Sequence, residues 1–402
     1  MAAPAVPTGQ AGQIGQIGRT AWRRAALALF SVAAGTNVPT PLLLIYRDHL
    51  HLSGPQATII FGVYAAGLAP SLLGAGPLSD RYGRRPVVVP FTLLAGLASL
   101  LFLTASASFP LLLLARFVQG LVSGAVFTAA SAWLAELSAA HGQGAAAGRR
   151  SAVALAGGFA AGPFVAGLLA VTLPGPLVLP YLVHAAVAVG GAVAVRTLPE
   201  TAPRRRRSHD DPIRPPLVHR GERLLAVTAL GPVAMCVYAF PATIIAGLPV
   251  LLDLPGNGVL ATGLLAGLTL GSGAVVAPLQ RRFGPWTAVA AATSGAVGLG
   301  LCMVAALVNS WAILIPAGLL MGAGSGWSLA SGLALTGRLA PPERRGALTG
   351  IFYTVAYTGF AAPFVITTAA RSSGSTTPLA VAGLLAALLA ARLVPAARSG
   401  RL

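Results

Sequence analysis

Long apolar stretches alternate with short polar turns along almost the whole chain. Each stretch has about 20 residues or more, so an α-helix of this length crosses the roughly 30 Å hydrocarbon core of a membrane. The stretches lie at about 25–46, 57–75, 86–107, 109–135, 151–172, 177–195, 224–251, 257–279, 286–308, 311–336, 346–369 and 376–394. The pattern predicts twelve transmembrane helices and therefore an all-α integral membrane protein.

The composition agrees with membrane-spanning helices and excludes a water-soluble domain. Of the 402 residues, 55% are hydrophobic and 9% are charged, whereas soluble domains carry about 25% charged residues. The net charge of +18 would indicate a nucleic-acid partner in a soluble protein. Here the 27 basic residues, all arginine, sit in short clusters between apolar stretches. Membrane topology explains them, so we expect no nucleic-acid partner.

The distribution of arginine predicts the orientation in the membrane. If the N-terminus is cytoplasmic, the even-numbered loops and both tails hold 23 of the 27 arginines, and the exceptions are Arg47, Arg116, Arg371 and Arg392. Loops rich in arginine favour the cytoplasmic side. Residues 1–20 are polar and lack a signal-peptide cleavage site. We therefore expect both termini in the cytoplasm and an uncleaved first span.

The longest hydrophilic segment, residues 196–223, contains several prolines and four consecutive arginines, which is typical of a linker. The predicted parts are a cytoplasmic tail (1–24), a six-helix bundle (25–195), a cytoplasmic linker (196–223), a second six-helix bundle (224–394) and a cytoplasmic tail (395–402). A shift of about half the chain superimposes residues 78–83 on 279–284, and Gly120 and Gly124 on Gly322 and Gly326. These repeats predict two related bundles around a central cavity.

Residues 76–85, with the sequence GPLSDRYGRR, place one acid and three arginines in a tight turn between the second and third stretches. They resemble the signature of the major facilitator superfamily, and the layout of six plus six helices agrees with that family. The resemblance implies a transporter rather than an enzyme. It also implies a cytoplasmic latch, in which Asp80 accepts hydrogen bonds near Gly346, at the start of span eleven. In the same latch Arg84 pairs with Glu136.

A latch of this kind is physically coherent. An anion is stabilised at a helix N-terminus, and charged pairs in a narrow crevice can hold two bundles together until they rock apart. The alternative is that these charges only anchor the topology. The latch candidates are Gly76, Asp80, Arg81, Gly83, Arg84, Arg85 and Glu136.

Residues 116–120 (RFVQG) lie within span four and resemble the family's arginine motif, which is linked to proton-coupled transport. An arginine inside a membrane is costly, so it is expected to face a polar cavity or a partner. Alternatively, Arg116 lies near enough to the outer surface to snorkel. The coupling candidates are Arg116, Gln119 and His184, although a lone histidine in a helix is often only a packed residue.

Residues 158–167 in span five resemble the family's glycine-proline motif, which is associated with exporters, with Ala166 in place of one glycine. Small residues spaced by four allow helices to pack closely, and proline bends a helix. The alternative is chance similarity, because glycine is abundant in this chain. The export-motif candidates are Gly158, Gly162, Pro163 and Gly167.

None of the nine acidic residues is placed at mid-membrane by the predicted spans. A cavity with few charges and an aromatic wall suits amphipathic organic molecules. The alternative for each aromatic residue is a place at the membrane interface or between helices. The cavity candidates are Asn37, Tyr64, Tyr238, Trp327, Tyr353 and Tyr357.

The hypothesis from the sequence is a secondary transporter of the bacterial inner membrane that exports small amphipathic or apolar compounds, such as drugs or metabolites, by proton antiport and alternating access. We expect a monomer in the lipid bilayer, with a small-molecule substrate and protons as partners and no metal or cofactor. An importer or facilitator of a neutral nutrient is the alternative. A membrane sensor or scaffold is a third possibility, which the short loops disfavour.

Overall fold

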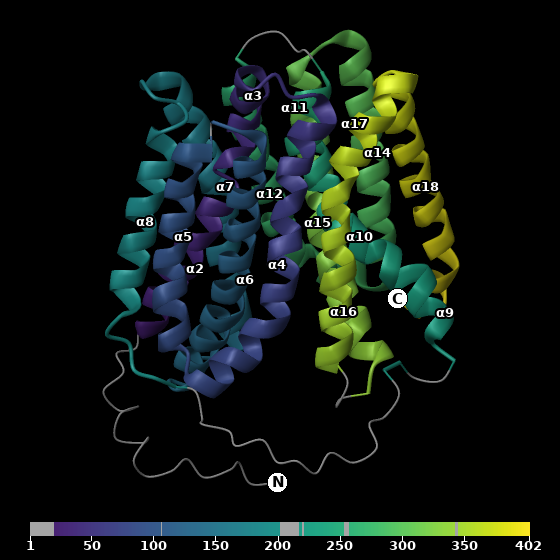
Figure 1. Ribbon diagram of the computed structural model, residues 1–402. Coiled ribbons are helices and arrows are strands. Elements are labelled where there is room, and N and C mark those ends of the chain that lie inside the picture. Colours follow the sequence, from purple (N-terminus) through teal and green to yellow (C-terminus); the bar gives the residue numbers. More distant parts are fainter. Residues whose placement is uncertain (1–19, 106, 202–216, 219–220, 253–256, 342–344) are drawn as a thin grey trace.

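A computed structural model describes residues 20–105, 107–201, 217–218, 221–252, 257–341 and 345–402. Every regular element in these ranges is a helix (Figure 1). Most of the predicted N-terminal tail and linker, including the run Arg204 to Arg207, lies outside the described residues, as do Asp253 and Glu343. The predicted boundaries of tails, bundles and linker therefore stay predictions.

The first half of the chain contains six apolar spans. Its elements are α2 (Ala21–Thr36), α3 (Pro39–His49), α4 (Gly54–Tyr82), α5 (Arg85–Ala105), α6 (Phe109–Ala139), η1 (Gly144–Ala146), α7 (Ala147–Thr172) and α8 (Leu179–Val195). Helices α2 and α3 together form span one.

The second half repeats this plan. Its elements are α9 (Arg223–Leu225), η2 (Ala226–Leu230), α10 (Gly231–Ala242), η3 (Thr243–Gly247), α11 (Leu248–Leu251), α12 (Gly258–Val276), η4 (Ala277–Leu279), α13 (Gln280–Phe283), η5 (Gly284–Trp286), α14 (Thr287–Val308), α15 (Trp311–Leu339), α16 (Arg345–Thr358), η7 (Gly359–Ala361), α17 (Ala362–Ser373) and α18 (Thr376–Arg398).

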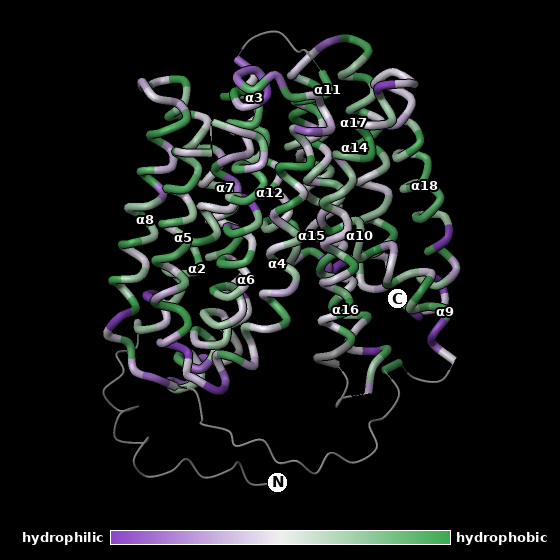
Figure 2. The backbone as a smooth tube through the Cα atoms, viewed as in Figure 1, coloured by the Kyte–Doolittle hydropathy of each residue, from purple (hydrophilic) through white to green (hydrophobic). Residues whose placement is uncertain are grey.

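The predicted spans correspond to these elements. Ten stretches of the described chain are long and apolar enough to cross a membrane. One of them, Gly258–Val308, contains two spans, α12 and α14, and the shorter apolar helix Leu179–Val195 supplies the remaining one. Figure 2 shows hydrophobic positions along the helices and hydrophilic positions gathered toward their two ends. The twelve spans in two six-helix bundles are confirmed.

Three spans are interrupted where proline removes backbone hydrogen bonds. Span one breaks between α2 and α3, because Pro39 and Pro41 have no N–H to donate to the carbonyls four residues earlier. Span seven contains two π-helical turns, η2 and η3, and the second follows Pro241. Span eleven narrows to the 3-10 turn η7 just before Pro363. The sequence windows did not predict these interruptions.

The two halves use the same glycine contacts. A Cβ atom on Gly120 of α6 would overlap the carbonyl oxygen of Tyr64 in α4, and one on Gly322 of α15 would overlap that of Thr269 in α12. The backbones of the second and fourth helix of each half therefore touch directly. Gly83 and Gly284, which the sequence repeat aligns, both have positive φ, +108° and +51°. The repeat read from the sequence is thus also a repeat of backbone geometry.

We expect Gly120→Ala to lower the stability of the protein, by roughly 1–3 kcal/mol, since the methyl group forces α4 and α6 apart. The measurement is thermal unfolding of the purified protein in detergent, followed by tryptophan fluorescence. Gly190→Ala is the matched control, because a Cβ at Gly190 has no atom within 4 Å and alanine favours the helix. Equal shifts for both variants would contradict direct backbone contact at Gly120.

Candidate functional site

The turns between the spans lie at two ends of the molecule (Figure 1). The Arg47 end carries the turn between α3 and α4, and the Arg84 end carries the turn between α4 and α5. The candidate site extends between these ends, along the boundary between the two halves.

Arg116 lies inside the first half and is only 1% exposed. Its Nε donates to the carbonyl of Ile60 (3.1 Å), and its Nη2 donates to that of Phe61 (3.3 Å). Its Nη1 donates to the carbonyl of Thr36 (2.7 Å) and to Oε1 of Gln119 (2.6 Å). The guanidinium therefore ties α6 to α2 and α4, and its donors point into the bundle rather than toward the membrane surface.

The break in span one supplies acceptors for this network. Pro39 cannot donate to Gly35, and the Gly35 carbonyl instead accepts from the N–H of Val38 at 3.3 Å and from Nε2 of Gln119 at 2.8 Å. The neighbouring carbonyl of Thr36 is the shortest contact of Arg116 to backbone. Two side chains of α6, Arg116 and Gln119, thus donate hydrogen bonds to backbone carbonyls at the break in span one, where the membrane interior offers no water.

Two aromatic rings complete the surroundings of Arg116. Its guanidinium carbon lies 5.6 Å from the ring centroid of Phe61 and 5.0 Å from that of Tyr64. These distances allow cation–π attraction. Carbonyl dipoles and ring faces stabilise the charge, and no carboxylate is among its described contacts. The role of Arg116 and Gln119 in coupling stays a prediction.

His184 is buried in the same half and bonded on both ring nitrogens. Nε2 lies 2.9 Å from the carbonyl of Ser31, and Nδ1 lies 2.6 Å from the hydroxyl of Ser99. A carbonyl can only accept, so in the neutral ring Nε2 donates and Nδ1 accepts from Ser99. The imidazole also fills the space over Gly35, where a Cβ would overlap it. Whether His184 carries a proton stays a prediction.

Six aromatic side chains meet where the halves face each other, and we call them the aromatic cluster. Tyr238 stacks on Tyr357 and Phe360, with ring centroids 4.9 and 4.8 Å apart. Phe360 also lies 5.3 Å from Phe61 and 6.1 Å from Tyr64, which belong to the first half. The members are Phe61, Tyr64, Tyr238, Tyr353, Tyr357 and Phe360.

The aromatic cluster contains four of the six predicted cavity residues. Phe61 and Phe360 were not predicted, because phenylalanine in an apolar span carries no signal that separates it from lipid-facing residues. The hydroxyl of Tyr64 is buried without a hydrogen-bond partner among the described residues. It is therefore available to a polar group that enters the cluster.

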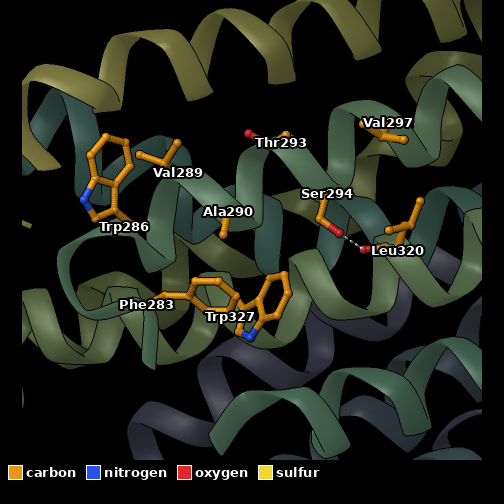
Figure 3. Close-up of a pocket in the computed structure, with 9 residues that line it drawn as sticks. All are labelled: Phe283, Trp286, Val289, Ala290, Thr293, Ser294, Val297, Leu320 and Trp327. Carbon is orange, nitrogen blue, oxygen red and sulfur yellow. Dashed lines mark hydrogen bonds between the residues drawn. The ribbon is translucent and has the colours of Figure 1, made fainter. Parts of the chain in front are cut away.

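The other two cavity candidates lie elsewhere. Asn37 ends α2, and its Oδ1 is 3.5 Å from the hydroxyl of Thr40. Trp327 packs edge-on against Phe283 at 5.2 Å and donates from Nε1 to the carbonyl of Val276. It lines a groove between α14 and α15, formed by the nine residues that Figure 3 labels, which we call the lateral groove.

Contacts between the halves gather toward the Arg47 end. The hydroxyls of Thr58 and Thr367 are 3.0 Å apart, and Nη1 of Arg47 donates to the carbonyl of Val250 at 3.0 Å. Toward the Arg84 end, α4 and α16 diverge (Figure 1). The pathway between the halves is therefore closed at the Arg47 end.

The export-motif residues form two tight contacts. Cβ atoms on Gly158 and Gly162 would overlap the carbonyls of Phe30 and Ala34, so these glycines pack α7 against α2. A Cβ on Gly167 would lie 3.2 Å from Cα of Gly263 in α12, and a Cβ on Gly263 would overlap the carbonyl of Pro163. The motif thus packs span five on span one and joins the two halves.

At the Arg84 end, the predicted ion pair is present. Nη2 of Arg84 lies 2.9 Å from Oε1 of Glu136, and Nη1 lies 2.7 Å from Oδ1 of Asp80. Burial opposes the charged form of Arg84, but the two carboxylates outweigh this effect and raise its pKa. The surroundings of Gly346 are not among those that the structure describes, so the predicted contact of Asp80 with Gly346 stays a prediction. The latch role itself stays a prediction.

Glu200, which follows the sixth span, completes this turn. Its carboxylate accepts the backbone N–H groups of Arg84 (2.8 Å) and Arg85 (3.0 Å), at the start of α5, where an anion is favoured. It also lies so close to Gly83 that a Cβ there would meet it. Glu200 was not among the predicted latch residues, because it lies far from the turn along the chain.

The remaining latch candidates have looser surroundings. Arg81 lies over the ring of Tyr82 at 5.3 Å, and a Cβ on Gly76 would lie 3.6 Å from the Thr128 side chain, an ordinary contact. The described partners of Arg84 all belong to the first half. These contacts connect parts of one bundle, and a latch between the two bundles stays a prediction.

Solved structures with the same fold include members of the POT family of transporters. One, in complex with 5-aminolevulinic acid, has a TM-score of 0.76 and 13% identity, over 95% of this chain and 96% of that chain. A mutant of the peptide transporter POT in complex with alafosfalin has a TM-score of 0.77 and 15% identity, over 98% and 99%. At this identity, the likeness shows the fold alone.

Among curated proteins, the chain is similar to the multidrug resistance protein MdtL. It is 46% identical to MdtL of Shewanella sp. (strain ANA-3) over 87 residues, and 41% identical to MdtL of Shigella flexneri over 85 residues. The chain spans about a fifth of the length of these relatives, since 22% of each is covered. The model of the Major Facilitator Superfamily matches residues 25–363. With the twelve spans and the paired halves, this match shows that the chain belongs to the Major Facilitator Superfamily of membrane transporters.

Proposed function

We propose that this transporter exports small amphipathic organic compounds, such as drugs or metabolites, from a bacterial cell by proton antiport. The observation that carries the proposal is the aromatic cluster, which is formed from both halves. Its rings offer stacking surface and the unpaired hydroxyl of Tyr64, and every described carboxylate lies toward the ends of the helices instead. Such a lining favours flat, weakly polar molecules over highly charged ones.

Two further observations support export. The glycine-proline segment at residues 158–167 resembles a motif associated with exporters and packs across the boundary between the halves. The curated relatives, which match about a fifth of the chain, are multidrug resistance proteins. We assign the Arg84 end to the cytoplasm of the bacterial inner membrane, because arginine clusters there. The closed Arg47 end then corresponds to a state that opens inward, and transport requires the opposite state as well.

The first test is accumulation of ethidium in everted membrane vesicles that contain the full chain. We expect uptake that requires a proton gradient and is abolished by an uncoupler. Tyr238→Ala removes a stacking partner worth about 0.5–1.5 kcal/mol, so the half-saturating ethidium concentration is expected to rise roughly two- to tenfold.

Tyr238→Phe is the matched control, because it keeps the ring and is expected to transport like the unmodified protein. Uptake that ignores the uncoupler would overturn proton coupling. Equal effects of the two Tyr238 substitutions would show that the ring does not contact the substrate. Proton-driven movement of a nutrient in the opposite direction would favour import.

The contact between Thr58 and Thr367 tests alternating access. With both residues changed to cysteine, an oxidant is expected to form a disulfide that holds the Arg47 end closed and stops transport, and a reductant is expected to restore it. The measurement is ethidium accumulation before and after reduction. Thr58→Cys alone is the control, and it should not respond to the oxidant. Full transport by the cross-linked protein would show that this end need not open.

Arg116→Lys tests whether geometry or charge matters at Arg116. Lysine keeps the charge but concentrates its donors at one point, so it cannot reach acceptors on α2, α4 and α6 together. We expect destabilisation of about 1.5–3 kcal/mol and a lower transport rate, measured by thermal unfolding and ethidium accumulation. Arg371→Lys, at an exposed position, is the control. Unchanged stability of Arg116→Lys would mean that the charge alone suffices.

A further inference from the structure

The lateral groove faces outward from the second half rather than toward the aromatic cluster. Helix α14 packs against α15 and α18, and its remaining surface is apolar and exposed, with Val297 50% and Leu307 67% accessible. Trp286, at one end of the groove, is 41% accessible. In a protein that spans the membrane, such a surface contacts lipid.

The groove covers about the depth of one leaflet. Its lining extends from Trp286 at the end of η5 to Val297 in α14, which is about 16 Å at 1.5 Å per residue. This is roughly half of a 30 Å hydrocarbon core. The end at Trp286 lies toward the Arg84 end, where tryptophan suits the boundary between hydrocarbon and headgroups.

The walls of the groove are suited to an apolar chain. The cavity has a volume of about 490 Å³. The hydroxyl of Ser294 donates to the carbonyl of Leu320 at 2.7 Å (Figure 3), and the indole N–H of Trp327 is bonded to the Val276 carbonyl. These two groups are already paired within the protein, so neither of them attracts a polar ligand.

Two arginines directly precede the groove residue Phe283 in the chain. Arg281 and Arg282 precede Phe283 in α13, and both are exposed. Neither has an ion pair among the described residues. In the sequence repeat, Arg281 occupies the position of Asp80, so the second copy of the turn has lost the acid that pairs with Arg84. The second copy therefore presents basic side chains where the first copy is internally paired.

We propose that the lateral groove binds one acyl chain of an anionic phospholipid, whose phosphate contacts Arg281 and Arg282. The apolar walls account for the chain, the depth accounts for a lipid of a single leaflet, and the two arginines account for the negative headgroup. This site is separate from the aromatic cluster and does not depend on the direction of transport.

The test uses the purified full chain in nanodiscs of phosphatidylcholine, with increasing fractions of a phospholipid brominated in mid-chain. Bromine quenches tryptophan fluorescence on contact. We expect brominated phosphatidylglycerol to quench at a lower fraction than brominated phosphatidylcholine. Trp286→Phe should remove much of this difference. Changing Arg281 and Arg282 together to glutamine should raise the half-quenching fraction of phosphatidylglycerol by up to roughly thirtyfold, from about 1 kcal/mol for each arginine.

The control changes Arg23 and Arg149 to glutamine, which removes two exposed charges from the first half at the same end. It should keep the preference for phosphatidylglycerol. Ala290→Leu, which fills the groove without altering charge, should reduce quenching by phosphatidylglycerol.

Three results would overturn the proposal. One is equal quenching by the two brominated lipids in the unmodified protein. Another is an equal loss of the preference for phosphatidylglycerol in the Arg281 and Arg282 variant and in the Arg23 and Arg149 control. The third is that ethidium, at the concentrations at which it is transported, relieves the quenching by brominated lipid. This result would assign the groove to the substrate instead.

Discussion

A buried guanidinium with no carboxylate among its described contacts is the constraint on which the first half depends. In the membrane interior, water cannot stabilise Arg116, so backbone carbonyls must do so. An intact helix uses its carbonyls in its own hydrogen bonds, and the prolines after Thr36 interrupt that pattern and release acceptors in span one. The break and the arginine are therefore coupled, since each satisfies a polar group that the other would leave unpaired.

This coupling fixes where the two halves can meet. Arg116 holds α2, α4 and α6 together, and Phe61 and Tyr64 cover its guanidinium with their rings. The same rings contact Phe360 of the second half. The network thus presents an aromatic surface to the neighbouring half, and movement between the halves can occur at that surface while the polar contacts behind it remain intact.

The hydropathic pattern was sufficient to predict the twelve spans, because the hydrocarbon core imposes a minimum length on each one. The repeat of glycines was also readable, since Gly120 and Gly322 stand at equivalent positions and allow the same backbone contact. The pairing of Arg84 with Glu136 came from family resemblance and is present in the structure. These features depend on composition and local spacing, which a sequence displays directly.

The remaining features depend on which side of a helix faces which neighbour. Tyr238 and Trp327 are both aromatic residues in the second half, yet one lies in the aromatic cluster and the other in the lateral groove. Both were predicted to line the cavity, because hydropathy and residue type are alike for the two and do not report which neighbour a helix face meets. Tyr238 faces Tyr357 and Phe360, whereas Trp327 faces Phe283 and the carbonyl of Val276, so the tertiary packing is required to separate the two environments.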